Sequence, residues 1–266
     1  MLYHARERRL YLDGRQMDCI TFGRGARPLV LLQGLNTRGI RGAALPLAWM
    51  YRMFAKEYTV YVFDRPAELP AGVTVRQLAA DTAAAMDALG VANADVLGVS
   101  QGGMIAQYLA IDRPDLVRRL VLAVTLARNN PTVEAVVHGW IDAALRGDAK
   151  WLVRDMAEKL YSDAYLKRYR PLLPLLTVLQ APRDVPRFTA LAQACLTCSV
   201  YDELDKLRCP VLVIGGQQDR VVTAGASREI AQKLGCPLYL YEGLGHAAYE
   251  EAGDFNRRVY RFFMQD

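Results

Sequence analysis

The sequence predicts an α/β fold, in which a mostly parallel central sheet is flanked by helices and carries a helical insertion. Three observations predict it. Short apolar runs typical of buried strands alternate with single helical segments over the first half of the chain. Only helical periodicity remains over residues 128–199, and strand–helix alternation resumes at about residue 210. Strands joined by single helices pair in parallel through right-handed crossovers. We therefore expect a core of residues 1–127 and 200–266 with a helical cap of residues 128–199.

The elements of the first half follow one another without long gaps. A Gly- and Pro-rich turn at 23–28 separates the first two strands, and a threonine at 74 and a glycine at 90 are typical of the start and the end of a helix. The expected strands cover 16–22, 29–32, 59–63, 94–99 and 120–125, and the expected helices cover 44–57, 74–89 and 102–111.

The second half begins with the insertion. Apolar residues recur at helical spacing and prolines separate the segments, which predicts helices over 133–145, 151–160, 165–169, 172–179 and 187–198. Strands over 210–214 and 238–241 then alternate with helices over 226–234 and from Phe255 onward. The sequence contains no internal repeat and no low-complexity tract.

Composition excludes several classes of protein. Of the 266 residues, 52% are hydrophobic and 23% are charged, as in globular proteins. The net charge of +5 comes from scattered Lys and Arg, without the basic block of a nucleic-acid or membrane surface. No signal-peptide pattern begins the chain, and no apolar run reaches the roughly 18 residues of a membrane span. We expect a cytoplasmic protein that acts on a small molecule without nucleic-acid or membrane partners, and a homo-oligomer is left open.

The cysteines do not indicate a disulfide framework. Five is an odd number, their spacing is irregular, and no export signal accompanies them, so reduced thiols are expected. Cys195 and Cys198 form a C-x-x-C, but zinc would require two further ligands. The remaining candidates stand singly before prolines, so buried thiols on a helix are favoured. We expect neither a metal nor an organic cofactor.

A candidate nucleophile lies in the segment from Gly98 to Gly103, which reads Gly-Val-Ser-Gln-Gly-Gly. The segment follows a buried strand and opens a helix, which is the context of a nucleophile elbow. Small residues two before and two after Ser100 allow so tight a turn. The N-terminus of the following helix directs free N–H groups at a developing oxyanion, and the N–H of Gln101 is the expected donor. The alternative is a simple glycine-rich turn.

With this motif in this context, the chain resembles the α/β-hydrolase fold family, in particular its small, capped bacterial members. The resemblance extends over nearly the whole chain. It is strongest over residues 95–122 and 209–263 and weakest in the insertion. It implies a catalytic triad in the chain order Ser, Asp, His.

A serine hydroxyl needs a base, and the chain has three histidines. His4 lies in a charged terminal segment and His138 inside the expected insertion. His246 follows the last strand in a glycine-rich loop, at the position where the family keeps its catalytic histidine. His246 is therefore the predicted base, and a structural loop histidine is the alternative.

The base needs a carboxylate that orients it. Asp219 follows the strand at 210–214 in Gly-Gly-Gln-Gln-Asp and resembles the acid of the family. Some relatives place the acid after the preceding strand, but the stretch from Thr125 carries no carboxylate before Glu134. Asp219 is therefore the predicted acid, with a solvated aspartate as the alternative.

The second oxyanion donor rests on the resemblance. Relatives usually carry His-Gly after the strand equivalent to residues 30–32, whereas this chain has Gln33-Gly34. The resemblance implies the backbone N–H of Leu35 as donor, and a main-chain donor survives the exchange of His for Gln. Asn36, Arg38 and Arg41 follow, and they either face the pocket or, as we expect for the arginines, lie solvated.

These residues predict a serine hydrolase that cleaves a small, apolar carboxylic ester or thioester through an acyl-enzyme. Aromatic and aliphatic residues of the insertion suggest an apolar site, although apolar residues at helical spacing are more often plain core; they are Trp140, Trp151, Tyr161, Tyr165, Leu172, Leu175 and Leu176. Alternatives on the same triad are a carbon–carbon bond hydrolase, a perhydrolase, or an amidase or aminopeptidase. A ligand-binding signalling protein with slow turnover is an alternative of another class. A dehalogenase is disfavoured because it needs a carboxylate where Ser100 stands.

Overall fold

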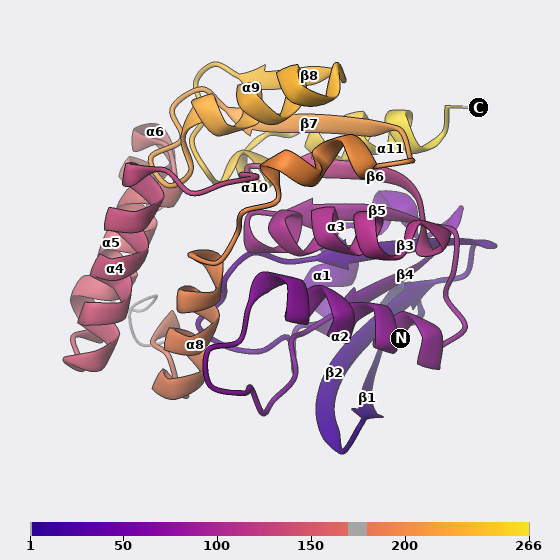
Figure 1. Cartoon of the computed structure of the whole chain (residues 1–266), viewed down its shortest axis with the longest axis horizontal. Helices are drawn as coiled ribbons and strands as arrows, with labels where there is room; N and C mark the ends of the chain where they lie inside the picture. The colour runs from indigo at the N-terminus through magenta and orange to yellow at the C-terminus, as the bar shows by residue number, and fades with distance from the viewer. Residues whose placement is uncertain (1, 170–179, 266) are drawn as a thin grey trace.

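One eight-stranded sheet organises the chain in the computed structural model, which describes residues 2–169 and 180–265 (Figure 1). The strand order is β1-β2-β4-β3-β5-β6-β7-β8. β1 pairs antiparallel with β2 and β2 antiparallel with β4, and all other neighbours are parallel. The strands are β1 Arg6–Leu12, β2 Arg15–Gly23, β3 Arg27–Leu32, β4 Tyr58–Phe63, β5 Ala94–Val99, β6 Val117–Ala123, β7 Val211–Gly216 and β8 Leu238–Tyr241. The predicted mostly parallel sheet is confirmed.

Helices cover both faces of the sheet. Alternate residues of β3 point to opposite faces, so that Val30 and Leu32 belong to one apolar cluster and Leu29 and Leu31 to the other. The first cluster includes buried side chains of α2, α3 and α9, and the second includes those of α1 and α11. The helices of this part are α1 Ala44–Met50, α2 Val75–Ala88, α3 Gln101–Asp112, α9 Thr223–Leu234, α10 Ala248–Glu251 and α11 Phe255–Phe263. Short 3-10 turns cover Leu2–His4, Arg52–Phe54, Pro114–Leu116 and Tyr201–Lys206.

Local chemistry sets the helix boundaries. Thr74 precedes α2 and accepts a hydrogen bond from the N–H of Gln77, whose side chain accepts one in return from the N–H of Thr74. This reciprocal pairing satisfies two donors that a helix start leaves free. Asn130 caps α4 through a single bond, in which its side-chain oxygen accepts from the N–H of Val133, and Pro131 is the first helical residue.

The segment between β6 and β7 contains helices and leaves the sheet at a single place. Its two ends meet in an antiparallel bridge between Arg128 and Ser199, and the N–H of Val200 donates to Ala127 O at 2.7 Å. The helices described there are α4 Pro131–Leu145, α5 Ala149–Leu160, α6 Asp163–Tyr169 and α8 Val185–Cys195, and they lie together beyond the ends of the central strands (Figure 1). The expected helix over 172–179 lies outside the described residues.

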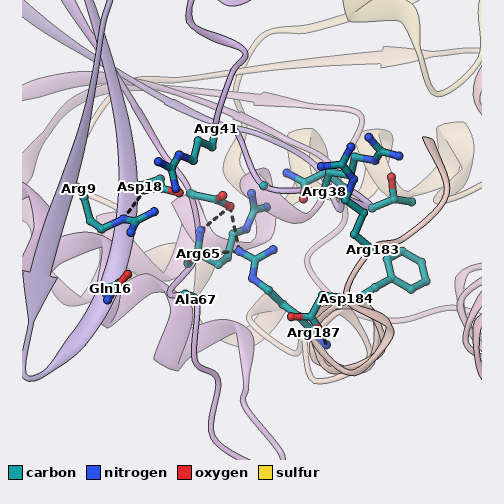
Figure 2. Close-up of a pocket in the computed structure, with 15 residues that line it drawn as sticks. Arg9, Gln16, Asp18, Arg38, Arg41, Arg65, Ala67, Arg183, Asp184 and Arg187 are labelled. Carbon is teal, nitrogen blue, oxygen red and sulfur yellow. Dashed lines mark hydrogen bonds and ion pairs between the residues drawn. The ribbon is translucent and has the colours of Figure 1, made fainter. Parts of the chain in front are cut away.

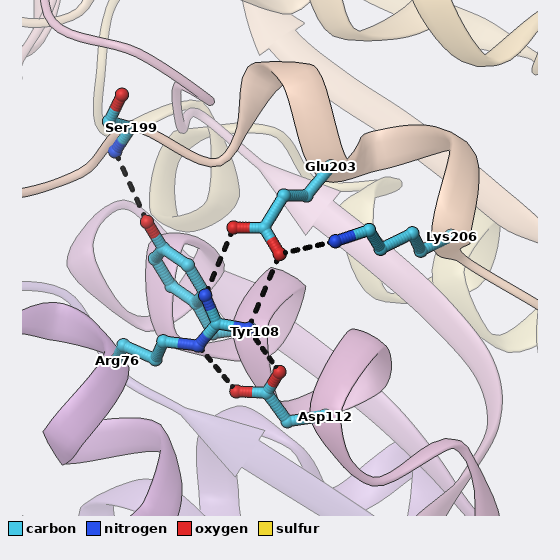
Figure 3. Close-up of polar contacts among 6 residues, drawn as sticks. All are labelled: Arg76, Tyr108, Asp112, Ser199, Glu203 and Lys206. Atoms are coloured by element: carbon cyan, nitrogen blue, oxygen red, sulfur yellow. Dashed lines mark hydrogen bonds and ion pairs between the residues drawn. The ribbon is translucent and has the colours of Figure 1, made fainter.

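A polar cluster joins this returning segment to two core helices (Figure 3). Arg76 of α2 binds Asp112 of α3 at 2.5 Å and Glu203, which follows the segment, at 3.0 Å. Tyr108 of α3 lies under the Arg76 guanidinium and accepts a hydrogen bond from the N–H of Ser199. Because these contacts join residues far apart in the sequence, they fix the end of the inserted segment against α2 and α3.

Three local differences from the sequence prediction have physical reasons. Residues 6–12 form β1, a mostly exposed edge strand whose charged residues hide the strand pattern. The helix expected over 44–57 ends at Met50 and continues as a 3-10 turn, because the chain must redirect into β4. The sixth strand covers Val117–Ala123 instead of 120–125, and Thr125 lies beyond it. Within residues 2–169 and 180–265, no helix has the length and apolarity to cross a bilayer.

Candidate active site

Ser100 occupies a strained turn between β5 and α3. Its backbone angles are φ 53° and ψ −119°, which non-glycine residues rarely adopt. A Cβ on Gly98 would lie 2.6 Å from Gly102 O, and a Cβ on Gly102 would overlap the carbonyl oxygen of Leu32. The close approach of strand, turn and helix therefore requires glycine at both positions.

Four hydrogen bonds hold the Ser100 backbone in this conformation. Its N–H donates to Ala123 O at 2.9 Å, and its carbonyl accepts from the N–H groups of Gly103 and Met104. The hydroxyl of Thr125 donates to the same carbonyl at 2.7 Å. These bonds offset the strain and fix the direction of the Ser100 side chain.

The structure brings the three predicted side chains together. His246 Nε2 lies 2.9 Å from Ser100 Oγ, and His246 Nδ1 lies 2.8 Å from Asp219 Oδ2. The side chains of His246 and Asp219 are nearly completely buried, whereas Ser100 is partly exposed. An imidazole that faces a carboxylate on one side and a hydroxyl on the other can take the hydroxyl proton. His4 and His138 are both exposed and take no part in this arrangement.

Asp219 is fixed as an ionised acceptor. Its second oxygen accepts hydrogen bonds from the N–H groups of Val221 and Val222 at 2.8 and 3.0 Å. Burial alone raises the pKa of this carboxyl, but the facing His246 and the two N–H donors outweigh burial and leave the pKa below its ordinary value. Asp219 can therefore stabilise a positive charge on His246.

The loop that carries His246 packs on the end of β7 and on the inserted segment. A Cβ on Gly216 would overlap the carbonyl oxygen of Gly245, so this approach also requires glycine. The N–H of Ala247 donates to Leu160 O at the end of α5, at 2.7 Å. The inserted segment thus contacts the residue that follows the predicted base.

The loop after β3 lies against the nucleophile. A Cβ on Gly34 would lie 3.2 Å from Ser100 Cβ and 3.7 Å from Ser100 Oγ. Within the described part of the chain, no group accepts a hydrogen bond from the N–H of Leu35 or of Gln101. Both predicted donors therefore remain available to a ligand.

Arg65 anchors this loop from beneath. Its guanidinium donates to the carbonyls of Gln33 and Gly34, the latter at 3.1 Å, and only 5% of the residue is exposed. Arg65 was not predicted, because nothing in the sequence indicates that the end of β4 lies under the loop after β3. The Thr125 hydroxyl was not predicted either, because the resemblance implies only a carboxylate after that strand.

The side chain of Gln101 faces the inserted segment. Its amide nitrogen donates to Leu191 O at 2.6 Å and lies 3.1 Å from Cys195 Sγ, both on α8. Cys195 and Cys198 are buried free thiols, as predicted, but α8 ends at Cys195 and Cys198 therefore lies beyond the helix on which it was expected. Among the described residues, no group of three or more His, Cys, Asp or Glu is arranged to hold a metal.

A pocket of about 510 Å³ opens beside the loop that follows Leu35 (Figure 2). Asn36, Arg38 and Arg41 line it, and Arg41 is also exposed to solvent. The loop turns here because Asp64 accepts the N–H of Ile40 at 3.0 Å, which folds residues 36–41 over the end of β4. Trp140, one of the expected pocket residues, is instead buried and donates its indole N–H to Asp155 at 2.8 Å.

Several proteins of known structure or function are similar to this chain. It is 28% identical over 92% of its length to the dihydrolipoyllysine-residue acetyltransferase component of the acetoin cleaving system of Cupriavidus necator, and it spans 66% of that protein. It is 29% identical over 70% of its length to pimeloyl-[acyl-carrier protein] methyl ester esterase of Neisseria meningitidis, with 75% of that enzyme covered. The enol-lactonase of Burkholderia xenovorans LB400 shares the fold, with a TM-score of 0.86, 22% identity, and 97% and 100% of the two chains covered.

The family model of the alpha/beta hydrolase fold matches residues 27–253. This range includes β3 to β8 and the residues Ser100, Asp219 and His246. Fold, strand order and sequence similarity agree. The chain belongs to the α/β-hydrolase fold family.

Proposed function

We propose that this protein is a serine hydrolase that cleaves a small carboxylic ester or thioester by transferring its acyl group to Ser100. The proposal depends on the position of His246. Its Nε2 lies 2.9 Å from Ser100 Oγ, and its Nδ1 lies 2.8 Å from Asp219 Oδ2. The relatives that support it include a methyl ester esterase.

The first half of the proposed reaction forms an acyl-enzyme. Ser100 Oγ attacks the substrate carbonyl carbon while His246 Nε2 takes the hydroxyl proton. The N–H groups of Leu35 and Gln101 hold the resulting oxyanion. His246 then gives its proton to the leaving alcohol or thiol, and the bond to the leaving group breaks.

The second half releases the acid. His246 takes a proton from water, the hydroxide attacks the acyl carbon, and the proton returns to Ser100 Oγ as the ester bond to the serine breaks. Asp219 stays ionised throughout and stabilises the imidazolium. The reaction as written needs neither a metal nor an organic cofactor.

We further propose that residues 128–199 act as a cap over this site. Two contacts support this role: Leu160 binds the loop of His246, and Leu191 binds the side chain of Gln101. A cover on both sides of Ser100 limits the access of water and shapes the space for the substrate. The predicted preference for an apolar acyl group is part of this proposal.

Hydrolysis of p-nitrophenyl acetate and butyrate tests the function. We expect turnover by the parent protein, loss in Ser100→Ala and His246→Ala, and parent activity in Ser227→Ala, which changes a buried serine outside the site. Turnover that persists in Ser100→Ala contradicts the assignment. Stoichiometric binding without turnover favours a signalling protein instead. If the protein does turn over, a panel of esters, thioesters and peptides distinguishes the enzyme classes.

A further inference from the structure

The pocket beside the loop after β3 is strongly basic. Six arginines and three aspartates line it, a formal surplus of three positive charges where the whole chain carries +5. The arginines come from β1, from the loop after β3, from the end of β4 and from the region where α8 begins (Figure 2). Separate segments of the chain thus direct positive charge toward one hollow.

Only part of this positive charge is neutralised by the aspartates. Arg9 binds Asp18 at 3.0 Å, and Arg187 binds Asp64 at 3.1 Å. The Arg65 guanidinium donates to the carbonyl groups of Gln33 and Gly34, and these groups carry no net charge.

Two exposed arginines of the pocket have neither an ion-pair partner nor a hydrogen-bond partner among the described residues. Arg41 and Arg183 form no ion pair or hydrogen bond within residues 2–169 and 180–265. They lie on two different segments of the lining, one on the loop after β3 and one just before α8. Each of the two guanidinium groups is therefore open to an anion in the pocket.

Two buried polar atoms of the lining have no hydrogen-bond partner among the described residues. They are Asn36 Oδ1 and Arg65 Nε. Burial lowers the pKa of the Arg65 guanidinium to about 10, and the nearby charge of Arg187 acts in the same direction against the attraction of Asp64. A buried charge and a buried donor without a partner are both unfavourable, and a bound anion would relieve those of Arg65, whereas Asn36 Oδ1 is an acceptor that an anion does not satisfy.

The pocket lies within reach of the nucleophile. Gly34 packs against Ser100, and Asn36 of the pocket follows only two residues later. Two steps between consecutive Cα atoms span at most about 8 Å. One small molecule can therefore place an ester carbonyl at Ser100 and a second group in the pocket.

We infer that this pocket binds an anionic group, a carboxylate or a phosphate, carried by the same ester that Ser100 cleaves. The planar fork of a guanidinium matches the oxygens of both anions. The inference rests on the proposed function and narrows its substrate class to esters with an apolar spacer between the reacting carbonyl and a negative charge.

Paired substrates test the inference. The parent protein is assayed with monomethyl esters of glutaric, adipic and pimelic acid, with the uncharged methyl esters of the same chain lengths, and with a methyl ester that ends in a phosphate. We expect kcat/KM for at least one charged ester to exceed that of its uncharged partner by about tenfold or more. The preferred ester identifies the anion as carboxylate or phosphate.

Variants locate the effect. Arg41→Gln and Arg183→Gln remove exposed charges, and each should reduce the ratio of charged to uncharged kcat/KM by about tenfold. Arg257→Gln, an exposed arginine of α11 outside the pocket, is the matched control and should leave the ratio unchanged. Added salt should lower the ratio in the parent protein, because these charges are exposed to solvent.

The experiments distinguish failure of the anion site from failure of the hydrolase function. If the parent protein hydrolyses charged and uncharged esters equally well, or if Arg41→Gln and Arg183→Gln behave like Arg257→Gln, the anion site is overturned while the hydrolase remains. If no ester in the panel is hydrolysed, the proposed function itself fails. Competitive inhibition of p-nitrophenyl acetate hydrolysis by adipate or inorganic phosphate gives a readout that does not depend on the ester chosen, and absence of inhibition by both contradicts the anion site.

Discussion

Replacement of Gly98 by alanine perturbs the turn that presents Ser100. The added Cβ would lie 2.6 Å from Gly102 O, 2.7 Å from Gly103 Cα and 2.8 Å from Ala106 Cβ. Ordinary contact begins at 3.4 Å, so the first turns of α3 must move away by 0.6 to 0.8 Å. All three atoms belong to one helix, and no flexible side chain can absorb the shift.

The expected result has two parts. Overpacking of this kind costs about 1–3 kcal/mol of unfolding free energy. The shift also moves the N–H of Gln101, and since a misplacement of about 1 Å costs about 10²-fold in rate, we expect kcat to fall by about ten- to a hundredfold. Urea unfolding and the hydrolysis of p-nitrophenyl butyrate measure the two effects.

Gly139 provides the matched control. It lies inside α4, where an added Cβ would meet only the tip of Trp151 at 3.7 Å. Alanine in a helix interior is more stable than glycine by about 0.5–1 kcal/mol, so Gly139→Ala should gain stability and keep its activity. A Gly98→Ala protein with the stability and the kcat of the parent would refute the packing argument.

Four further predictions concern charge and burial. Asp219→Asn should lower kcat on the order of 10⁴-fold with little change in KM, because the amide no longer stabilises the imidazolium; steady-state kinetics at pH 7 check this, and a loss confined to KM argues against it. The lowered pKa of the Asp219 carboxyl means that the folded protein binds fewer protons than the unfolded chain below about pH 4. The ionised carboxylate therefore stabilises the fold above that pH, and this stabilisation is lost as the pH falls. The drop in the urea midpoint from pH 5 to pH 3 should be smaller in Asp219→Asn than in the parent. Iodoacetamide at pH 8 should spare Cys19 and Cys195, because both thiols are buried and burial raises the pKa of Cys19 to about 12 and that of Cys195 to about 11. Peptide mapping should find Cys209 and Cys236 labelled first because these two are partly exposed, although burial raises the pKa of both as well; early labelling of Cys19 contradicts the packing. Arg76→Gln should lower the unfolding free energy by about 1 kcal/mol through loss of its contacts with Asp112 and Glu203, while Arg257→Gln leaves it unchanged.

The sequence predicted those features that depend on local patterns. The buried strand before Ser100 is almost wholly apolar, and the glycines around Ser100 leave room for one kind of turn, so β5, α3 and the position of Ser100 were all predictable. The edge strand β1 was not, since most of its residues are exposed and no apolar alternation marks it.

Contacts between distant segments were beyond the sequence. The Arg65 guanidinium binds the carbonyls of Gln33 and Gly34, which precede it by 32 and 31 residues, because the end of β4 lies under the loop after β3. The arginines of the pocket lie on separate segments, and only the fold of residues 36–41 over the end of β4 brings them together. A motif can locate Ser100, but it does not locate the groups that hold its surroundings.

The central claim is that His246, oriented by Asp219, makes Ser100 the one reactive hydroxyl of this site. Treatment with a fluorophosphonate probe, followed by digestion and mass spectrometry, tests it most directly. The claim predicts a single adduct on the peptide that contains Ser100, strongly slowed labelling in His246→Ala, and none of that adduct in Ser100→Ala. An adduct on another residue, or labelling of Ser100 at the parent rate without the imidazole, would contradict it.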